Sequence, residues 1–272
     1  MARAPWCKST PVIMGILNVT PDSFSDGGRY QSVEEAFDHA RLMIEEGADI
    51  IDVGGESTRP YSEPVAEKEE LNRVIPVIEK LHGIPGALIS VDTYKANVAR
   101  EALKAGADWV NDISGLTYDA AMAGVIAEKD AYAVIMHIKG TPRNMQENPH
   151  YDDVAGEIRG FLQERIEYAV RMGIDRKKII VDPGIGFGKR VEDNLRILKM
   201  LREFKKLGCP VLVGTSMKSF IGKITDMPLE ERVEGTLATL AVALMNGADI
   251  VRVHDVRKAR KVLNMVKAVM EA

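Results

Sequence analysis

Eight short runs of apolar, largely β-branched residues alternate along the chain with longer segments in which apolar residues recur at helical spacing. The runs that we interpret as strands are 12–19, 50–55, 88–93, 109–114, 132–138, 179–184, 211–216 and 250–255. Segments between them, such as 33–47 and 67–83, repeat apolar residues every three or four positions, as a helix with one buried face does. This alternation indicates parallel pairing, and the nearly continuous apolar runs indicate strands covered on both faces.

Eight such units close naturally into a barrel, and we predict an α/β fold with a single (β/α)8 TIM barrel domain over residues 1–272. The alternative is a doubly wound open sheet, whose first strand should lead into a glycine-rich dinucleotide-binding turn. The residues after Val19 read TPDSFSDGG, which is a polar loop instead. No linker, low-complexity tract or shift of composition divides the sequence.

The charge balance argues against two kinds of partner. The formal net charge of -4 gives no electrostatic reason to expect nucleic acid or an anionic membrane, so a local cluster of donors must hold any anionic ligand. The N-terminal residues lack the apolar run of a signal peptide, and no stretch approaches the roughly 20 apolar residues of a membrane span. Cys7 and Cys209 form neither a disulfide framework nor a metal motif. We therefore expect a cytoplasmic protein with free thiols.

Polar side chains gather where the predicted strands end. In chain order they are Asn18, Asp52, Asp92, Asn111, Asp112, His137, Asp182, Lys218, Arg252, His254 and Asp255. Barrel enzymes carry their reactive groups at this end of the strands, so we interpret these residues as a site. Arg252 and His254 are two residues apart and point to one face. Together with Asn18 from the neighbouring strand, they predict a pocket for phosphate or pyrophosphate, because a guanidinium offers a bidentate donor fork.

Some of these residues have a second interpretation. An aspartate at a strand end often caps the following helix, and the sequence leaves this open for Asp52, Asp112 and Asp255. Asp92 and Asp182 would repel each other across one barrel mouth unless a cationic or hydrogen-bond-donating ligand lay between them.

Three further residues and two loops lie beside the predicted strand ends. We expect a structural role for His137, whereas Met136 and Phe187 are either core residues or walls of a flat pocket. The long loops 20–30 and 56–66 are rich in Gly, Pro and Ser, which is typical of loops that bind ligands or act as lids.

Two long motifs carry a family resemblance. The segment 14–28, MGILNVTPDSFSDGG, and the segment 52–60, DVGGESTRP, resemble the first two signatures of dihydropteroate synthases. The resemblance continues through shorter motifs over essentially the whole chain: SVDT at 90–93, NDIS at 111–114, MH at 136–137, DPGIGFGK at 182–189, GTS at 214–216 and RVHD at 252–255. The first two motifs are specific, and the short ones would be weak alone.

The resemblance implies an enzyme of folate biosynthesis, usually a homodimer, that joins a dihydropterin pyrophosphate to p-aminobenzoate. It implies that Mg²⁺ assists the departure of pyrophosphate and that sulfonamides compete with p-aminobenzoate. By position, it implies that Asp92, Asn111, Asp182 and Lys218 hold the pterin. It implies that Asn18, Arg252 and His254 hold the pyrophosphate, with Asn18 also binding Mg²⁺, and that Phe24, Thr58, Arg59, Pro60 and Ser219 shape the p-aminobenzoate side.

The chemistry suits these residue types. A carboxylate such as Asp182 can accept the adjacent N–H groups of a pterin, Lys218 can donate to the acceptor edge of the ring, and Arg252 can lie flat on its face. Departure of pyrophosphate leaves positive charge on the pterin, which Asp92 would stabilise. The aryl amine is a neutral nucleophile that needs no strong base. We therefore expect a dissociative substitution dominated by stabilisation of the leaving group.

One position departs from the family pattern. The family usually reads Ser-Arg-Lys after the seventh strand, whereas this chain reads Ser216-Met217-Lys218 and so lacks a charge near the expected p-aminobenzoate carboxylate. Two other functions are considered. A methyltetrahydrofolate-dependent methyltransferase has a similar barrel but lacks the two signatures and needs no pyrophosphate pocket. A pterin-binding protein without catalysis would explain Met217 but not the other residues.

Overall fold

The computed structural model describes residues 11–20, 29–86 and 88–272. Within these residues the chain forms eight strands that all pair in parallel. They are β1 (Val12–Asn18), β2 (Ile50–Gly54), β3 (Leu88–Asp92), β4 (Trp109–Asp112), β5 (Tyr132–Met136), β6 (Ile179–Asp182), β7 (Leu212–Val213) and β8 (Ile250–Val253). The sheet order is β6-β5-β4-β3-β2-β1-β8-β7, and a parallel bridge between Val181 and Val211 joins its two edges. The fold is therefore the predicted (β/α)8 TIM barrel.

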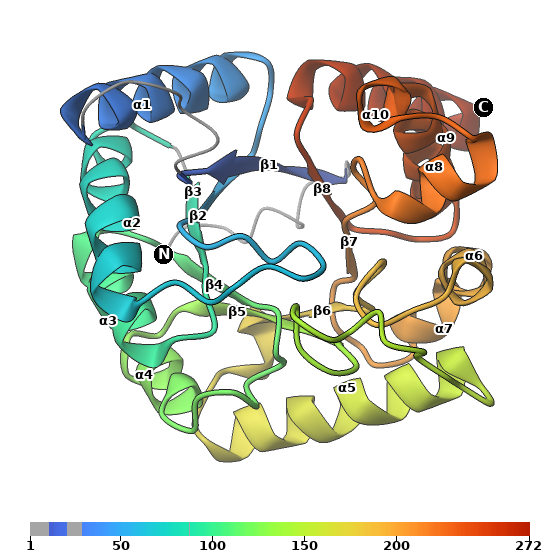
Figure 1. Ribbon diagram of the computed structural model, residues 1–272, viewed down its shortest axis with the longest axis horizontal. Coiled ribbons are helices and arrows are strands. Elements are labelled where there is room, and N and C mark those ends of the chain that lie inside the picture. The colour runs from blue at the N-terminus through green and yellow to red at the C-terminus, as the bar shows by residue number, and fades with distance from the viewer. Residues whose placement is uncertain (1–10, 21–28, 87) are drawn as a thin grey trace.

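The helices surround the strands in chain order, as Figure 1 shows. They are α1 (Arg29–Glu45), α2 (Glu67–His82), α3 (Ala96–Ala105), α4 (Met122–Glu128), α5 (Val154–Arg171), α6 (Val191–Lys199), α7 (Arg202–Lys205), α8 (Ser219–Thr225), α9 (Val233–Met245) and α10 (Val256–Glu271), with short 3-10 turns η3 (Arg176–Lys178) and η4 (Leu229–Glu231). Among the helices of the described ranges, none is long and apolar enough to span a bilayer.

The strand side chains divide between two apolar cores because successive residues of a strand point to opposite faces. Residues such as Val91, Val181 and Val251 point outward and pack with the buried faces of the helices in one large cluster. A second cluster fills the inside of the barrel, and its buried members are Val12, Met14, Ile50, Trp109, Val134, Ile180, Leu212 and Ile250. The barrel interior is thus packed with side chains rather than open.

The strand register brings the predicted site residues to one end of the barrel. Asn18, Gly54, Asp92 and Asn111 are successive partners across β1, β2, β3 and β4. On the other side of the barrel, Asp182 is the last residue of β6, where its partner on β5 is Met136. Parallel pairing places the carboxyl ends of all these strands together.

The predicted strands start where the observed ones start, except for the seventh, and they run one or two residues too long at the carboxyl end. The seventh is the largest difference, because only Leu212 and Val213 join the ladder of the predicted 211–216. The chain turns after these residues, and Met217 has a left-handed φ of 58°. The helices predicted at 33–47 and 67–83 are α1 and α2.

Candidate active site at the carboxyl end of the barrel

Arg252 lies between two carboxylates inside the barrel. Its Nε donates to Asp52 Oδ2 at 2.6 Å, and its Nη2 donates to Asp92 Oδ2 at 2.6 Å. The amide of Asn111 donates to the same oxygen of Asp52 at 2.9 Å. The structure thus brings the predicted residues Asp92, Asn111 and Arg252 together. Two nitrogens of Arg252 are bound to carboxylates, and its contact with a pyrophosphate stays a prediction.

The sequence left open whether Asp52 caps a helix or belongs to the site. Its bonds to Arg252 and Asn111 make it part of this cluster. It is fully buried in the barrel interior, and the next helix, α2, begins only at Glu67, so Asp52 caps no helix. The signal was present in the sequence, because Asp52 shares a strand face with Ile50 by the same spacing that joins Arg252 to Ile250. An aspartate in the middle of an inward face is part of the barrel interior.

The other two undecided aspartates hold the backbone. Asp112 accepts N–H groups of Ser114 and Leu116, at 2.7 and 3.1 Å, and so shapes the turn after β4. Asp255 accepts the N–H of Lys258 at 2.9 Å and is the N-cap of α10. Local hydrogen bonds of this kind explain both residues without a ligand.

Burial and charge compete over the ionisation of the cluster. Burial raises the pKa of Asp92 to about 7 even though Arg252 lowers it, and the charges of Asp52, Glu70 and Asp112 raise it further. Burial also raises the pKa of Asp182 to about 6, against the N–H of Gly184 and the charge of Lys218, which lower it. Both carboxyls therefore titrate close to neutral pH.

The two cations of the site differ in the direction of their shifts. Burial lowers the pKa of Lys218 to about 8; Arg252 lowers it too, while Asp182 and Asp92 oppose this change. For Arg252, burial is outweighed by the carboxylates of Asp52 and Asp92, which raise its pKa. Arg252 therefore keeps its charge throughout the accessible pH range, whereas Lys218 can lose its proton in mildly alkaline solution.

An apolar wall stands beside these charges. Met136 and Phe187 belong to one buried cluster with Ile113, Ile138 and Met145, and Tyr94 packs against it. The ammonium of Lys218 lies 4.0 Å from the ring centroid of Phe187, and the Lys218 stem runs past Gly186, where a Cβ would meet its Cδ at 3.1 Å. Lys218 is thus held between a ring and a carboxylate at one side of the mouth.

His137 has the expected structural role. It is buried, its Nδ1 is 3.0 Å from the ammonium of Lys189, and Lys189 also donates to the Phe187 carbonyl at 2.9 Å. Burial lowers the pKa of His137 to about 2 and that of Lys189 to about 7. The pair ties β5 to the loop that carries Phe187.

His254 and Asn18 lie at the rim of the mouth. His254 is exposed, and its Nδ1 is 2.9 Å from Ser216 Oγ. Partial burial and the charges of Arg252, Lys218 and Arg59 lower its pKa to about 4, so its ring is neutral at pH 7. Asn18 Oδ1 and Asp92 Oδ2 flank Gly54, at 3.8 and 3.7 Å from the point where a Cβ would stand. A larger residue at position 54 would press against both groups.

The loop 56–66 is held by Glu56, a buried carboxylate just beyond β2 to which no role was assigned from the sequence. Glu56 accepts the phenol of Tyr94 at 2.5 Å, the ammonium of Lys95 at 2.6 Å and the N–H of Val65 at 2.8 Å. Lys95 also donates to the Val65 carbonyl at 2.6 Å and to Glu70. These bonds join the two ends of the loop.

Between those ends lie the three residues expected on the p-aminobenzoate side, with Thr58 half-buried and Arg59 and Pro60 exposed. Phe24, which was expected beside them, lies outside the described residues.

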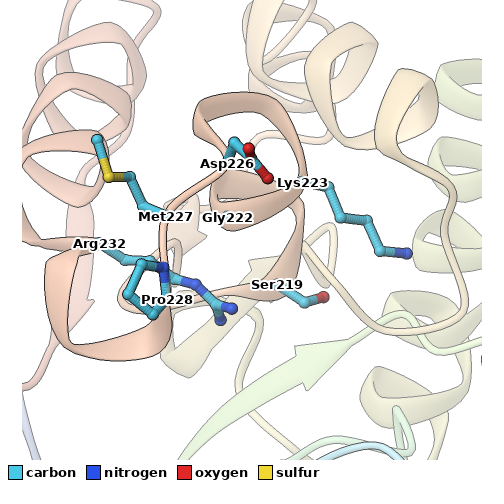
Figure 2. Close-up of a pocket in the computed structure, with 7 residues that line it drawn as sticks. All are labelled: Ser219, Gly222, Lys223, Asp226, Met227, Pro228 and Arg232. Atoms are coloured by element: carbon cyan, nitrogen blue, oxygen red, sulfur yellow. The ribbon is translucent and has the colours of Figure 1, made fainter.

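Ser219, the last residue expected on the p-aminobenzoate side, is the exposed first residue of α8. It lines a pocket of about 550 Å³, drawn in Figure 2, together with Gly222, Lys223, Asp226, Met227, Pro228 and Arg232. The residues that line this pocket include neither of the carboxylates that bind Arg252. Ser219 is the one predicted site residue in it.

The arrangement can bind a flat heterocycle with donor groups, because acidic and amide groups face an apolar wall and a cation. A family model described as "Pterin binding enzyme" matches residues 14–254. The chain belongs to the pterin-binding enzyme family.

Relatives of this pterin-binding family have both sequence and fold in common with the chain. A dihydropteroate synthase of Bacillus subtilis is 51% identical over 263 residues, covering 97% of this chain and 90% of the relative. The Yersinia pestis dihydropteroate synthase in complex with a sulfonamide drug has a TM-score of 0.92 at 44% identity, with 97% and 96% of the two chains covered. The Xanthomonas albilineans enzyme with 4-aminobenzoic acid has a TM-score of 0.91 at 44% identity, covering 97% and 94%.

Proposed function

We propose that this protein is a transferase that condenses 6-hydroxymethyl-7,8-dihydropterin pyrophosphate with p-aminobenzoate to give 7,8-dihydropteroate and pyrophosphate. The observation that carries the proposal is the bridge from Asp52 through Arg252 to Asp92, with Asp182 and Lys218 near it. The departure of pyrophosphate from a pterin requires charged groups of this kind. They are gathered at the end of the barrel where barrel enzymes carry their active sites.

The pterin would lie against the wall that contains Met136 and Phe187. Asp182 would accept paired N–H groups from its pyrimidine edge, and Lys218 would donate to its acceptor edge. Asn111, which is buried beside Asp52, would add an amide contact. Because Asp182 titrates near pH 6, its carboxylate is mostly ionised at pH 7 and able to accept these bonds.

In the reaction, the bond between the pterin methylene carbon and the pyrophosphate oxygen breaks, and a bond from that carbon to the amine nitrogen forms. The electron pair of the broken bond leaves with pyrophosphate, and the new secondary amine releases one proton. Ionised Asp92 stabilises the positive charge that develops on the pterin. Ser216 Oγ accepts the backbone N–H of His254 at 3.3 Å and lies 2.9 Å from His254 Nδ1, and we propose that its hydroxyl donates to this nitrogen. The ring proton then sits on Nε2, where it can donate to the pyrophosphate.

The residues present fit Mg²⁺ as a cofactor. No cluster of three or more His, Cys, Asp or Glu side chains that could cage a metal exists in the described ranges. Mg²⁺ does not need one, because it usually keeps several waters and is held by one or two protein oxygens together with substrate phosphates. Asn18 Oδ1, at the rim near Asp92, offers such an oxygen. When bound, the ion would neutralise charge on the departing pyrophosphate.

The test is release of pyrophosphate that depends on p-aminobenzoate, measured with and without Mg²⁺. A methyltransferase or a non-catalytic pterin binder would release no pyrophosphate. Absence of release would therefore contradict the proposal. Adding a sulfonamide should raise the apparent KM for p-aminobenzoate. Arg59 and Ser219 are the positions at which to look for a change in this competition, because both are expected on the p-aminobenzoate side.

We also propose that the protein is a homodimer built on α9 and α10. Exposed apolar side chains are concentrated there: Val242 and Met245 on α9, and Met265, Val269 and Met270 on α10. The other face of α9 is buried through Leu240 and Leu244, so this helix is apolar on more than one side. Such a patch is typical of an interface. Sedimentation should give twice the chain mass, and a double V242E/M245E variant should give a monomer.

A further inference from the structure

Met217, the residue that departs from the family pattern, has an unusual backbone. Its φ of 58° lies in the left-handed region, which a residue with a Cβ adopts only when its surroundings enforce it. Its side chain points to α9, where the sulfur is 3.9 Å from Thr236 Oγ1.

Two side chains on the start of α9 bind both polar groups of Met217. The N–H of Met217 donates to Thr236 Oγ1 at 3.0 Å, and Arg232 Nη1 donates to the Met217 carbonyl at 3.4 Å. The two residues are four apart, so they lie on one face of the helix start. Thr236 is buried, and its N–H bonds the Arg232 carbonyl at 2.9 Å.

Arg232 is committed to this contact. Its guanidinium packs on α8 at Gly222, where a Cβ would stand 2.5 Å from Nε, and Figure 2 shows it extending into the pocket toward Ser219. In the described part of the chain it forms no ion pair with a carboxylate, and its buried Nε has no hydrogen-bond partner. Burying a guanidinium with an unpaired Nε costs free energy, so the bond that Arg232 keeps to the Met217 carbonyl has to offset this cost.

The turn that these residues hold supplies three neighbouring positions of the site. Ser216 binds His254, Lys218 lies over Phe187, and Ser219 begins α8. We propose that Thr236 and Arg232 are positioning residues that hold Met217 in its left-handed conformation and thereby aim Lys218 and Ser219 at the substrates. This proposal rests on the function proposed above, since it names supports of the same site.

The experiment is a double-mutant cycle that combines Thr236→Val with Met217→Gly. Thr236→Val keeps the shape of the side chain and removes its hydroxyl, and Met217→Gly lets residue 217 adopt a positive φ without strain. Thr236→Val alone should lower kcat/KM about ten-fold, the effect of roughly 1.4 kcal/mol in transition-state binding. In the Met217→Gly background the same substitution should cost less than about two-fold, because the turn no longer needs the hydroxyl. Equal losses in both backgrounds, or no loss in either, would overturn the proposal.

The matched control is Thr239→Val on the same helix, whose hydroxyl bonds the backbone carbonyls of Gly235 and Thr236. It should change kcat/KM less than two-fold, and Thr236→Ser should retain the parental value. If Thr236→Val does not fold, Arg232→Met enters the same cycle.

Calorimetric binding of 6-hydroxymethylpterin to all variants separates the two proposals. A parental protein without turnover would contradict the proposed function, while loss of pterin affinity in Thr236→Val, relieved in the Met217→Gly background, would still support the positioning role.

Discussion

The inside of the barrel has two halves that are built from the same strands. Toward the amino ends of the strands, Ile50, Ile180 and Ile250 belong to a fully apolar cluster. Two residues further along the same strands stand Asp52, Asp182 and Arg252, which carry the charges of the site. Residues two apart on a strand share a face. The apolar core and the charged site are therefore only two residues apart on each of these strands.

The two halves have opposite energetics. Burying the isoleucines is favourable at about 25 cal/mol per Å² of apolar surface. Burying Asp52, Asp92 and Arg252 costs free energy, which their mutual hydrogen bonds offset only while all three are present. We therefore expect substitutions in the charged half to affect turnover most and substitutions in the apolar half to affect stability alone.

The largest effect on turnover is expected from Arg252→Met. This change leaves Asp52 and Asp92 facing each other without their cation, so it should lower kcat/KM by about 10³-fold or more and the free energy of unfolding by about 3 kcal/mol. Steady-state kinetics and urea unfolding measure both. Arg41→Met, which breaks surface pairs with Asp38 and Glu45, is the control and should change neither by much. Activity within ten-fold of the parent would contradict the role of Arg252.

Asp92→Asn should have the next largest effect. The amide keeps the shape of the side chain but cannot stabilise developing positive charge, so kcat should fall by about 10²- to 10³-fold. Asp175→Asn is a suitable comparison, because Asp175 is exposed and caps only the short turn η3. Near-normal turnover in Asp92→Asn would exclude the charge role of this residue.

The pH profile should show a smaller, graded effect of the same carboxylate. The pKa of Asp92 is raised to about 7, so acidification below that value protonates it and should lower kcat/KM, with Asp182 following near pH 6. Above pH 8, Lys218 loses its charge and kcat/KM should fall again. In Asp92→Asn, the decline near pH 7 should be absent, so the acid limb should lie near pH 6 while the decline above pH 8 remains.

The same shift predicts the sign of the stability change. A carboxyl whose pKa is raised by folding binds its proton more tightly in the folded state. The contribution of Asp92 to the free energy of unfolding is therefore full below about pH 4 and is lost as the pH rises through 7.

The charged half was harder to predict from the sequence than the apolar half. The strands could be found because each is a local apolar run, and their starts were predicted to within one residue. The predicted strands extended too far at their carboxyl ends. The polar residues there no longer pair in the sheet, because the chain turns at the mouth of the barrel. Gly47 and Gly106 follow helices and have a positive φ. A glycine after a helical pattern is likewise a local signal, here for the end of a helix.

Contacts between distant parts of the chain had no local signal. Arg252 reaches across the barrel to β3, and nothing near position 252 in the sequence names Asp92 as its partner. For the same reason Glu56 could not be linked to Lys95, nor Met217 to Thr236, before the fold was known. The motifs indicated which residues belong to the site, whereas the pairs among them depend on barrel closure and side-chain reach.

The smallest effect on turnover is expected from Ile250→Ala, on the same strand and face as Arg252. Ile250 is fully buried in the inner cluster, so its truncation should lower the free energy of unfolding by about 2 to 4 kcal/mol. The charged residues stand one step further along the strands and keep their partners, so kcat/KM at a temperature where the variant is folded should stay within about three-fold of the parent. A loss of activity as large as that of Arg252→Met would mean that the two halves are one mechanical unit, since packing below the site would then control the geometry of the charges above it. Retained activity with lowered stability would show that a strand can carry a core and a reactive centre two residues apart with little coupling between them.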